Sequence, residues 1–259
     1  MKSANGLAYK SLEPSDSHTY DAVAGEYYDE RLHPTCADFR AAASLYLKKF
    51  FETRRPAGRL ADVGCGSSLI AEFQTRDLVL IDKSWEMLNR NKPDLEKRCI
   101  DVERECIGSG EFDWIFAILG DPYNSPRAWK NFSNALKPGG QCAFIVPSND
   151  WAGSFRRKCK DEKPNFARFL TSKGETVFLR SLIVGPEDQA KMITEANLSI
   201  TAIEHVQVGE LPYVRSPKVL GFLSPDQYLL DVYLAKKPQA PEKGGLSRIA
   251  KSAPGQDVS

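Results

Sequence analysis

An acid, Asp62, stands two residues before the first of two glycines, Gly64 and Gly66, with Cys65 between them. The short apolar stretch before Asp62 predicts a strand, so these residues fall in the turn that ends it. Glycine lets backbone amides come close to a ligand. The residues through Phe73 have a helical pattern, and the positive N-terminus of such a helix would point to the same place. The run therefore predicts a site for a nucleotide-like molecule with a negatively charged end.

Two ligand classes use such a turn, and spacing separates them. A dinucleotide fingerprint needs Gly or Ala three residues after the second glycine. Leu69 stands there, which argues against a nicotinamide oxidoreductase. The early acid and the small residue Ser68 instead resemble motif I of class I S-adenosylmethionine-dependent methyltransferases. That resemblance implies S-adenosylmethionine as the cofactor, with contacts from Asp62, Gly64, Cys65 and Gly66.

A second acid follows one strand later. The apolar run 78–81 predicts a buried parallel strand, and Asp82 at its carboxyl end could accept hydrogen bonds from both hydroxyls of a ribose. The residues after it, 83–88, resemble the family's motif II. This resemblance implies that Asp82, Lys83 and Met87 contact the cofactor, with Met87 on the adenine. Alternatively, Met87 belongs to the apolar face of the next helix.

Two further strands extend the resemblance. The segment 98–103 resembles motif III, in which an acid that ends the third strand binds the adenine amino group, and this implies contacts from Asp101 and the backbone of Val102. A fourth strand is predicted over 111–119, and its last residue, Leu119, is expected in the cofactor site. A fifth strand follows a helix and a Lys-Pro-Gly-Gly turn, so the resemblance covers residues 59–147.

The fourth strand leads into Asp121-Pro122-Tyr123. Methyltransferases that act on the amino groups of bases or on protein amides often carry Asn/Asp-Pro-Pro-Tyr/Phe at this place. The alternative is an ordinary turn that ends the strand and lines the pocket. In both cases Asp121 and Tyr123 are candidate catalytic residues, because ligands of such sheets bind outside the carboxyl ends of the strands.

The segment Tyr20–Asp29 resembles the opening of the small-molecule, type 11-like branch of the family, in which a helix folds over the cofactor as a lid. The resemblance implies that an aromatic residue, Tyr27 or Tyr28, lies near the methionine moiety. The alternative is that these tyrosines only fix the helix to the domain.

His33 precedes Pro34 and a helix predicted over 37–51. In a lid loop, this histidine could act as a base or hold a substrate, and it is the third catalytic candidate. Alternatively, it belongs to a helix-capping loop in which Thr35 is the cap.

The predicted fold is α/β: a Rossmann-like, doubly wound, seven-stranded and mostly parallel sheet with an N-terminal helical lid and a β-hairpin insertion. The strands of the hairpin are predicted over 167–171 and 176–180, and the last two strands of the sheet over 199–206 and 228–235. A helix over 186–196 lies between them.

The expected organisation has five parts along the 259 residues. A flexible N-terminus (1–19) precedes the lid (20–58), the methyltransferase domain spans 59–237 with its insertion at about 150–185, and a disordered tail covers 238–259. Within the insertion, a basic cluster at 155–160 is interpreted as a solvated helix face, with contact to an anionic substrate as the alternative.

Composition excludes several classes of protein. A formal net charge of +1 argues against a mainly electrostatic nucleic-acid binder, so nucleic acid is not the favoured partner. No apolar run approaches the ~18 residues of a membrane span, and the first residues lack the apolar core of a secretion signal, so a cytoplasmic protein is expected. Six cysteines without a C-x-x-C pair and three scattered histidines predict neither a disulfide scaffold nor a metal site.

These observations favour an S-adenosylmethionine-dependent methyltransferase with a small-molecule acceptor. The alternative from another class is a non-catalytic scaffold or regulatory protein that binds the cofactor, because motif I indicates binding and not turnover. The sequence identifies neither the acceptor and its methylated atom nor the oligomeric state, because these depend on loops and surfaces.

Overall fold

The computed structural model describes residues 17–159, 163 and 165–240. Most of the predicted flexible N-terminus (1–19) and of the predicted tail (238–259) therefore lies outside the described residues. No helix in the described part of the chain is long and apolar enough to cross a membrane. All six cysteines are free thiols, of which Cys99 and Cys106 are exposed.

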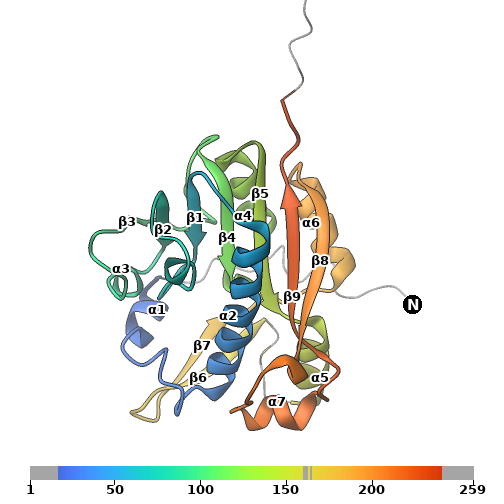
Figure 1. Ribbon diagram of the computed structural model, residues 1–259. Coiled ribbons are helices and arrows are strands. Elements are labelled where there is room, and N and C mark those ends of the chain that lie inside the picture. The colour runs from blue at the N-terminus through green and yellow to red at the C-terminus, as the bar shows by residue number, and fades with distance from the viewer. Residues whose placement is uncertain (1–16, 160–162, 164, 241–259) are drawn as a thin grey trace, which may run out of the picture.

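A seven-stranded sheet forms the centre of the molecule, in the order β3-β2-β1-β4-β5-β9-β8 (Figure 1). The first five strands run parallel, and β9 lies antiparallel between β5 and β8. This confirms the predicted doubly wound, mostly parallel sheet. The strands are β1 (Leu60–Val63), β2 (Leu78–Asp82), β3 (Glu96–Cys99), β4 (Phe112–Ile118), β5 (Leu136–Pro147), β8 (Ser199–Gln207) and β9 (Tyr228–Lys236).

Helices cover both faces of the sheet (Figure 1). One apolar core lies between the sheet and helices α2 (Pro34–Arg54), α5 (Asn149–Lys158) and α7 (Pro217–Phe222). A second lies between the sheet and helices α4 (Pro126–Ala135) and α6 (Pro186–Glu195).

Neighbouring residues of one strand alternate between these two cores. Leu60 contributes to the first core and Ala61 to the second, and all four residues of β1 are buried. Because helices cover both faces of the sheet, the central parallel strands consist of continuous apolar residues. Such runs are easy to recognise in a sequence, so these strands could be predicted.

The helix predicted after the glycine turn is wrong, and only a single 3-10 turn, η2 (Ile70–Glu72), forms there. The Ser68 N–H donates to Asn91 Oδ1 at 2.9 Å, and the Ala71 N–H donates to Ser68 Oγ at 3.0 Å as in a helix N-cap, but the turn ends at Phe73. The long helix expected directly after the glycine turn is therefore missing from the described part of the chain. The third strand also ends earlier than predicted, and Asp101 lies in the loop beyond it.

The predicted hairpin insertion is confirmed as β6 (Phe166–Leu170) and β7 (Thr176–Arg180), a separate two-stranded antiparallel sheet. Helix α1 (Ser17–Val23) lies near the hairpin and near α3 (Trp85–Leu88). It ends before the paired tyrosines, which follow in turns, so the lid is only partly helical. Helix α7 was not expected in the loop before β9.

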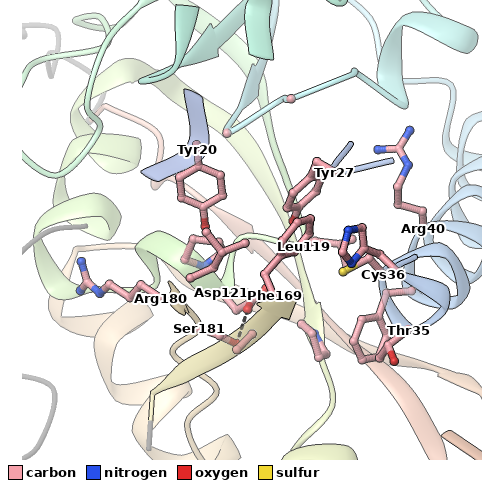
Figure 2. A pocket seen from close by; sticks show the side chains of 18 of the residues that line it. Tyr20, Tyr27, Thr35, Cys36, Arg40, Leu119, Asp121, Phe169, Arg180 and Ser181 are labelled. Atoms are coloured by element: carbon pink, nitrogen blue, oxygen red, sulfur yellow. Dashed lines mark hydrogen bonds between the residues drawn. The ribbon is translucent and has the colours of Figure 1, made fainter. Parts of the chain in front are cut away.

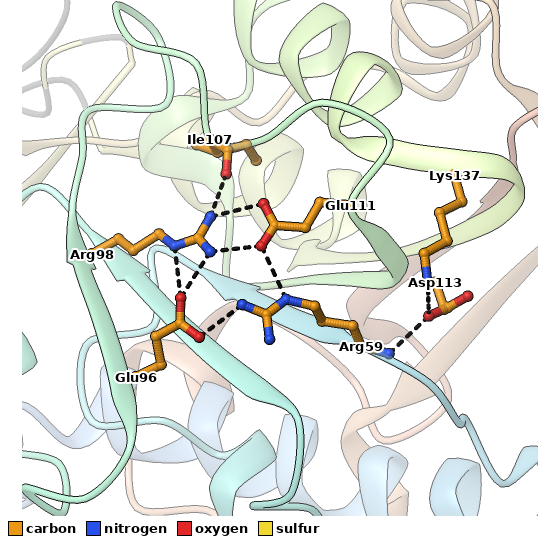
Figure 3. Close-up of polar contacts among 7 residues, drawn as sticks. All are labelled: Arg59, Glu96, Arg98, Ile107, Glu111, Asp113 and Lys137. Carbon is orange, nitrogen blue, oxygen red and sulfur yellow. Dashed lines mark hydrogen bonds and ion pairs between the residues drawn. The ribbon is translucent and has the colours of Figure 1, made fainter.

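A network of charged side chains connects the strands at their amino ends, which is the end of the sheet opposite the carboxyl ends (Figure 3). Arg59 pairs with Glu96 at 2.7 Å and with Glu111 at 2.9 Å. Arg98 pairs with the same two carboxylates at 2.7 and 2.6 Å. This network connects the edge strand β3 to β1 and to the start of β4 across β2.

We expect the Arg98→Gln variant to lower the free energy of unfolding by about 1 kcal/mol at low salt, because a partly exposed network of ion pairs is worth little more than that. The loss should shrink in molar salt, which screens such charges. Denaturant titration of both proteins at two salt concentrations measures it. Arg76→Gln is the control, because this side chain is 92% exposed and only approaches Asp77 at 3.6 Å. An Arg98 loss that does not depend on salt would contradict an electrostatic role.

Candidate active site

A cavity of about 580 Å³ opens at the carboxyl ends of β1, β2 and β4 (Figure 2). The lid, the hairpin and the starts of α2 and α7 enclose it from the other sides. Fourteen of the fifteen residues that the sequence named as candidates for the site line this cavity: Tyr27, Tyr28, His33, Gly64, Cys65, Gly66, Asp82, Lys83, Met87, Asp101, Val102, Leu119, Asp121 and Tyr123. Asp62 is the exception and lies buried beneath the glycine turn.

The glycine turn requires glycine at both positions. Gly64 and Gly66 have φ values of 62° and 48°, in the left-handed region. A Cβ on Gly64 would lie 2.2 Å from the Tyr123 ring, and one on Gly66 would lie 2.0 Å from the Tyr28 hydroxyl. The Tyr28 hydroxyl accepts the Ser67 N–H at 2.6 Å, whereas the Tyr123 hydroxyl donates to the Val63 carbonyl at 2.5 Å. The two tyrosines thus lie so close to the turn that a side chain on Gly64 or Gly66 would clash with them.

Asp82 connects the turn to the next strand. Its Oδ2 accepts the Gly66 N–H at 2.9 Å and its Oδ1 accepts the Ser84 N–H at 2.9 Å. Burial raises the pKa of this carboxyl, while the two backbone hydrogen bonds and Lys83 oppose the rise. Each carboxylate oxygen has two lone pairs, so Asp82 keeps capacity for two hydroxyl donors from a ligand.

Asp62 lies under the turn with 1% of its surface exposed. Its Oδ2 accepts the Ser68 hydroxyl at 2.6 Å, but its Oδ1 is buried without a hydrogen-bond partner among the described residues. Burial raises the pKa of this carboxyl to about 7, with a further increase from Asp82. Asp62 therefore supports the turn from below and does not reach the cavity.

The remaining candidates for cofactor contacts surround the same cavity. Lys83 lies over the Tyr20 ring, with Nζ 5.3 Å from the ring centroid, and burial lowers its pKa. Met87 is 2% exposed and packs in a small cluster with Val23 and Phe169. Its apolar packing, the alternative reading, therefore holds, and it lines the cavity as well.

Leu119 directly follows β4 and has a strained conformation. Its φ is 54°, and a bulky residue rarely adopts the left-handed region. Such strain is typical of functional sites, and it turns the chain toward Asp121 at the cavity edge. On the other side, Asp101 Oδ1 accepts the Glu103 N–H at 3.0 Å, and Val102 is buried.

Rings from the lid and the hairpin meet above the cavity. Tyr27 stacks on Phe169 with a centroid distance of 5.6 Å and an interplanar angle of 7°, and His33 stacks on the same ring at 3.6 Å. The Ser172 N–H at the tip of the hairpin donates to Glu26 at 2.9 Å. The lid and the hairpin, far apart in sequence, therefore form one roof.

His33 occupies the N-cap position of α2 but makes no capping hydrogen bond with its side chain. Its Nε2 is buried without a partner among the described residues, and burial lowers the pKa of the imidazole. The alternative in which Thr35 caps the helix is wrong, because Thr35 Oγ1 instead contacts Ser216 Oγ at 2.7 Å. His33 is therefore a neutral, buried group at the cavity wall.

Asp121 and Tyr123 lie in a 3-10 turn, η3 (Asp121–Tyr123), at the cavity edge. Ser181 Oγ donates to Asp121 Oδ2 at 2.5 Å, and the Asp121 carbonyl accepts the Leu182 N–H at 2.8 Å. The hydroxyl of Tyr123 is bonded to β1, as described above. These contacts favour the alternative in which residues 121–123 form an ordinary turn that lines the pocket. They do not favour a role in binding the amino group of an acceptor.

Two groups at the site were missed by the sequence reasoning. Arg40 of α2 donates to the Ser67 carbonyl at 3.1 Å and stacks over the Tyr28 ring at 4.6 Å. Arg180 pairs with Glu103 at 2.5 Å, with 2% and 3% of the two side chains exposed, and Arg180 Nε is buried without a partner in the described part of the chain. A buried charged pair next to a cavity is costly unless it is fully bonded. No local pattern marks either arginine, because their partners are distant in sequence.

The fold can be compared with known structures. A methyltransferase from Clostridium acetobutylicum has 16% identity and a TM-score of 0.52, covering 86% of this chain and 97% of its own. One from Mesorhizobium loti has 15% identity and a TM-score of 0.52, covering 75% and 98%. The complex named DhpI-SAM-HEP has 14% identity and a TM-score of 0.56, covering 85% and 95%. No family model and no curated protein sequence matches the chain.

The chain has the fold of S-adenosylmethionine-dependent methyltransferases. In this methyltransferase fold, the cavity lies where the carboxyl ends of the parallel strands meet, the usual ligand position in open α/β sheets. Among the described residues, no group of three or more His, Cys, Asp or Glu side chains could hold a metal ion.

We expect stability to depend on pH through Asp62. Because its pKa is raised to about 7 in the folded state and is about 4 in an unfolded chain, the folded state binds more protons between these values. The free energy of unfolding should therefore decrease as pH rises from about 4 to about 7, by up to about 1.4 kcal/mol per pH unit from this group. Denaturant titrations of wild type and Asp62→Asn across this range measure the difference in slope.

Asp77→Asn is the control for that series, because Asp77 is 57% exposed and precedes the same strand, β2. Its pH dependence should match that of the wild type. Equal slopes for wild type and Asp62→Asn would show that folding does not raise the pKa of Asp62.

Proposed function

We propose that this protein is an S-adenosylmethionine-dependent methyltransferase that transfers a methyl group to a small-molecule acceptor by in-line displacement. One observation carries the proposal: residues from all three cofactor motifs, and from the lid, line a single cavity at the carboxyl ends of the strands. The methyltransferase fold is compatible with it. A cytoplasmic location stays a prediction, supported by the free cysteines.

The residues around the cavity fit this cofactor. Asp82 keeps acceptor capacity for the ribose hydroxyls, and the glycine turn leaves no Cβ between backbone and ligand. Asp101, Val102, Met87 and Lys83 form the wall at which the adenine would lie. Cys65, Leu119 and Tyr28 lie beside the turn, where the methionine moiety would bind. Asp62 would act indirectly, by supporting the turn.

When bound, the cofactor supplies a methyl group already activated on a sulfonium sulfur. The chain then has to align the acceptor and exclude water, and positioning alone can supply ~7 to 11 kcal/mol of a reaction barrier. The roof formed by Tyr27, His33 and Phe169 suits the exclusion of water. His33 Nε2 is available to accept a proton from the acceptor, and Asp121 and Tyr123 shape the floor.

A small molecule is the favoured acceptor because lid and hairpin together cover the cavity. Among the described residues, no contact favours an amino group of a base or a protein amide as the acceptor, since the Asp121 carbonyl and carboxylate already accept hydrogen bonds. A non-catalytic scaffold would use the same cofactor contacts, so turnover distinguishes it from an enzyme.

Isothermal titration of the purified protein with S-adenosylmethionine, and separately with NADH, tests the proposal. We expect micromolar binding of S-adenosylmethionine and no binding of NADH. Incubation of cell extract with the protein and a methyl-labelled cofactor should then label a low-molecular-weight fraction. Binding without any labelled product would favour the scaffold, and NADH binding would overturn the proposal.

We expect Asp82→Ala to weaken S-adenosylmethionine binding about 10- to 100-fold, because hydrogen bonds to a charged acceptor are worth about 1.5 to 3 kcal/mol. Calorimetric titration measures the change. Asp77→Asn, at the opposite end of β2, is the control and should bind as the wild type does. An unchanged affinity for Asp82→Ala would remove this residue from the cofactor site.

A further inference from the structure

One wall of the cavity is built from rings that the cofactor motifs do not explain. Phe39 of α2 packs edge-on against Trp151 of α5 at 5.6 Å, and Trp151 stacks on Phe155 at 4.7 Å with an interplanar angle of 4°. Phe166 and Phe169 of the hairpin line the same cavity. A cavity wall lined by aromatic rings favours an aromatic, mainly apolar ligand.

His33 lies at the roof end of this wall. It is 8% exposed, its ring stacks on Phe169, and its Nε2 is buried without a hydrogen-bond partner among the described residues. A buried polar atom without a partner is costly and rare in native proteins. It therefore points to a ligand that supplies the missing hydrogen bond.

The other polar groups on this side have partners. Thr35 and Ser216 bond to each other at 2.7 Å, Lys218 Nζ lies 4.7 Å from the centroid of the Phe155 ring, and Asp121 accepts the Ser181 hydroxyl. Burial raises the pKa of the Cys36 thiol to about 11, so it stays protonated. His33 Nε2 is thus the group on this wall best suited to accept a proton.

We infer that the acceptor is a small planar phenol, methylated on its hydroxyl oxygen, with His33 Nε2 as the base; this inference rests on the proposed function. A phenol must lose its one hydroxyl proton as it is methylated, and His33 Nε2 is one atom that can accept it. An aromatic amine can attack the methyl group with its lone pair before it loses a proton, so it does not need such a base. An imidazole can deprotonate a phenol, with a pKa of about 10 like that of tyrosine, but is too weak a base for an aliphatic alcohol.

The step balances without another reactant. The hydroxyl proton moves to Nε2 as the oxygen lone pair forms the new O–CH3 bond. The S–CH3 bond breaks and its electron pair goes to sulfur, so the cationic sulfonium becomes a neutral thioether. The imidazolium then releases its proton to water. The ring wall holds the phenol, and the roof keeps water from the methyl group.

The test uses the full-length protein with S-adenosylmethionine and a panel of phenol, catechol and 2-naphthol, matched with aniline, 2-naphthylamine and cyclohexanol. Mass spectrometry of products and formation of S-adenosylhomocysteine are measured. We expect methylation of one or more phenols and of none of the matched compounds. Trp151→Leu should raise KM for the phenol and leave the cofactor affinity unchanged.

A nitrophenol separates a base from a structural residue, because it is already ionised at mildly alkaline pH and needs no base. His33→Gln should lower kcat for the best phenol by about 100-fold or more, a usual contribution of a general base. For the matching nitrophenol the loss should be only a few-fold. Equal losses for both compounds would show that His33 has only a structural role and would overturn the inference.

The outcomes also separate this inference from the proposed function. If S-adenosylmethionine binds but no phenol is methylated, or only an amine or alcohol is, the inference is wrong and the cofactor assignment stands. If S-adenosylmethionine does not bind, both are wrong.

Discussion

The close approach of two tyrosines to the glycine turn is the constraint on which the rest of the site depends. Tyr28 and Tyr123 occupy the space where a Cβ of Gly66 or Gly64 would lie, and both form hydrogen bonds to this part of the chain. Asp82 fixes the turn from the next strand through the Gly66 N–H. Because these contacts involve the lid, β1, β2 and the end of β4, the turn holds four segments together.

The sheet makes this arrangement possible. Parallel strands with both faces covered by helices bring their carboxyl ends to one edge, so Gly64, Asp82 and Leu119 lie around one cavity although they are far apart in the chain. The charged network around Arg98 lies at the opposite edge and stabilises β3 without entering the site. The charged network therefore lies at one end of the strands and the cavity at the other.

Four buried side-chain polar atoms have no partner in the described part of the chain. His33 Nε2 and Arg180 Nε belong to residues that line the cavity, Asp62 Oδ1 lies beneath the glycine turn, and Gln189 Nε2 lies away from the cavity. Each lowers the stability of the folded protein, because a buried polar group loses its hydrogen bonds to water. The concentration of three of them near one cavity is typical of a site arranged for a ligand rather than for maximal stability. The left-handed conformation of Leu119 indicates the same.

The sequence by itself determined the sheet and the residues at the carboxyl ends of its strands. Buried parallel strands are uninterrupted apolar runs, and the residues that follow them must lie at the carboxyl end of the sheet. The prediction failed after the glycine turn, where the helical pattern forms only the 3-10 turn Ile70–Glu72, because a short helix depends on tertiary packing that the local pattern does not record. Only the tertiary structure brought Arg40 to the turn and Arg180 to Glu103, across separations of 27 and 77 residues. Such contacts depend on how lid and hairpin fold over the sheet, and no local periodicity records that packing.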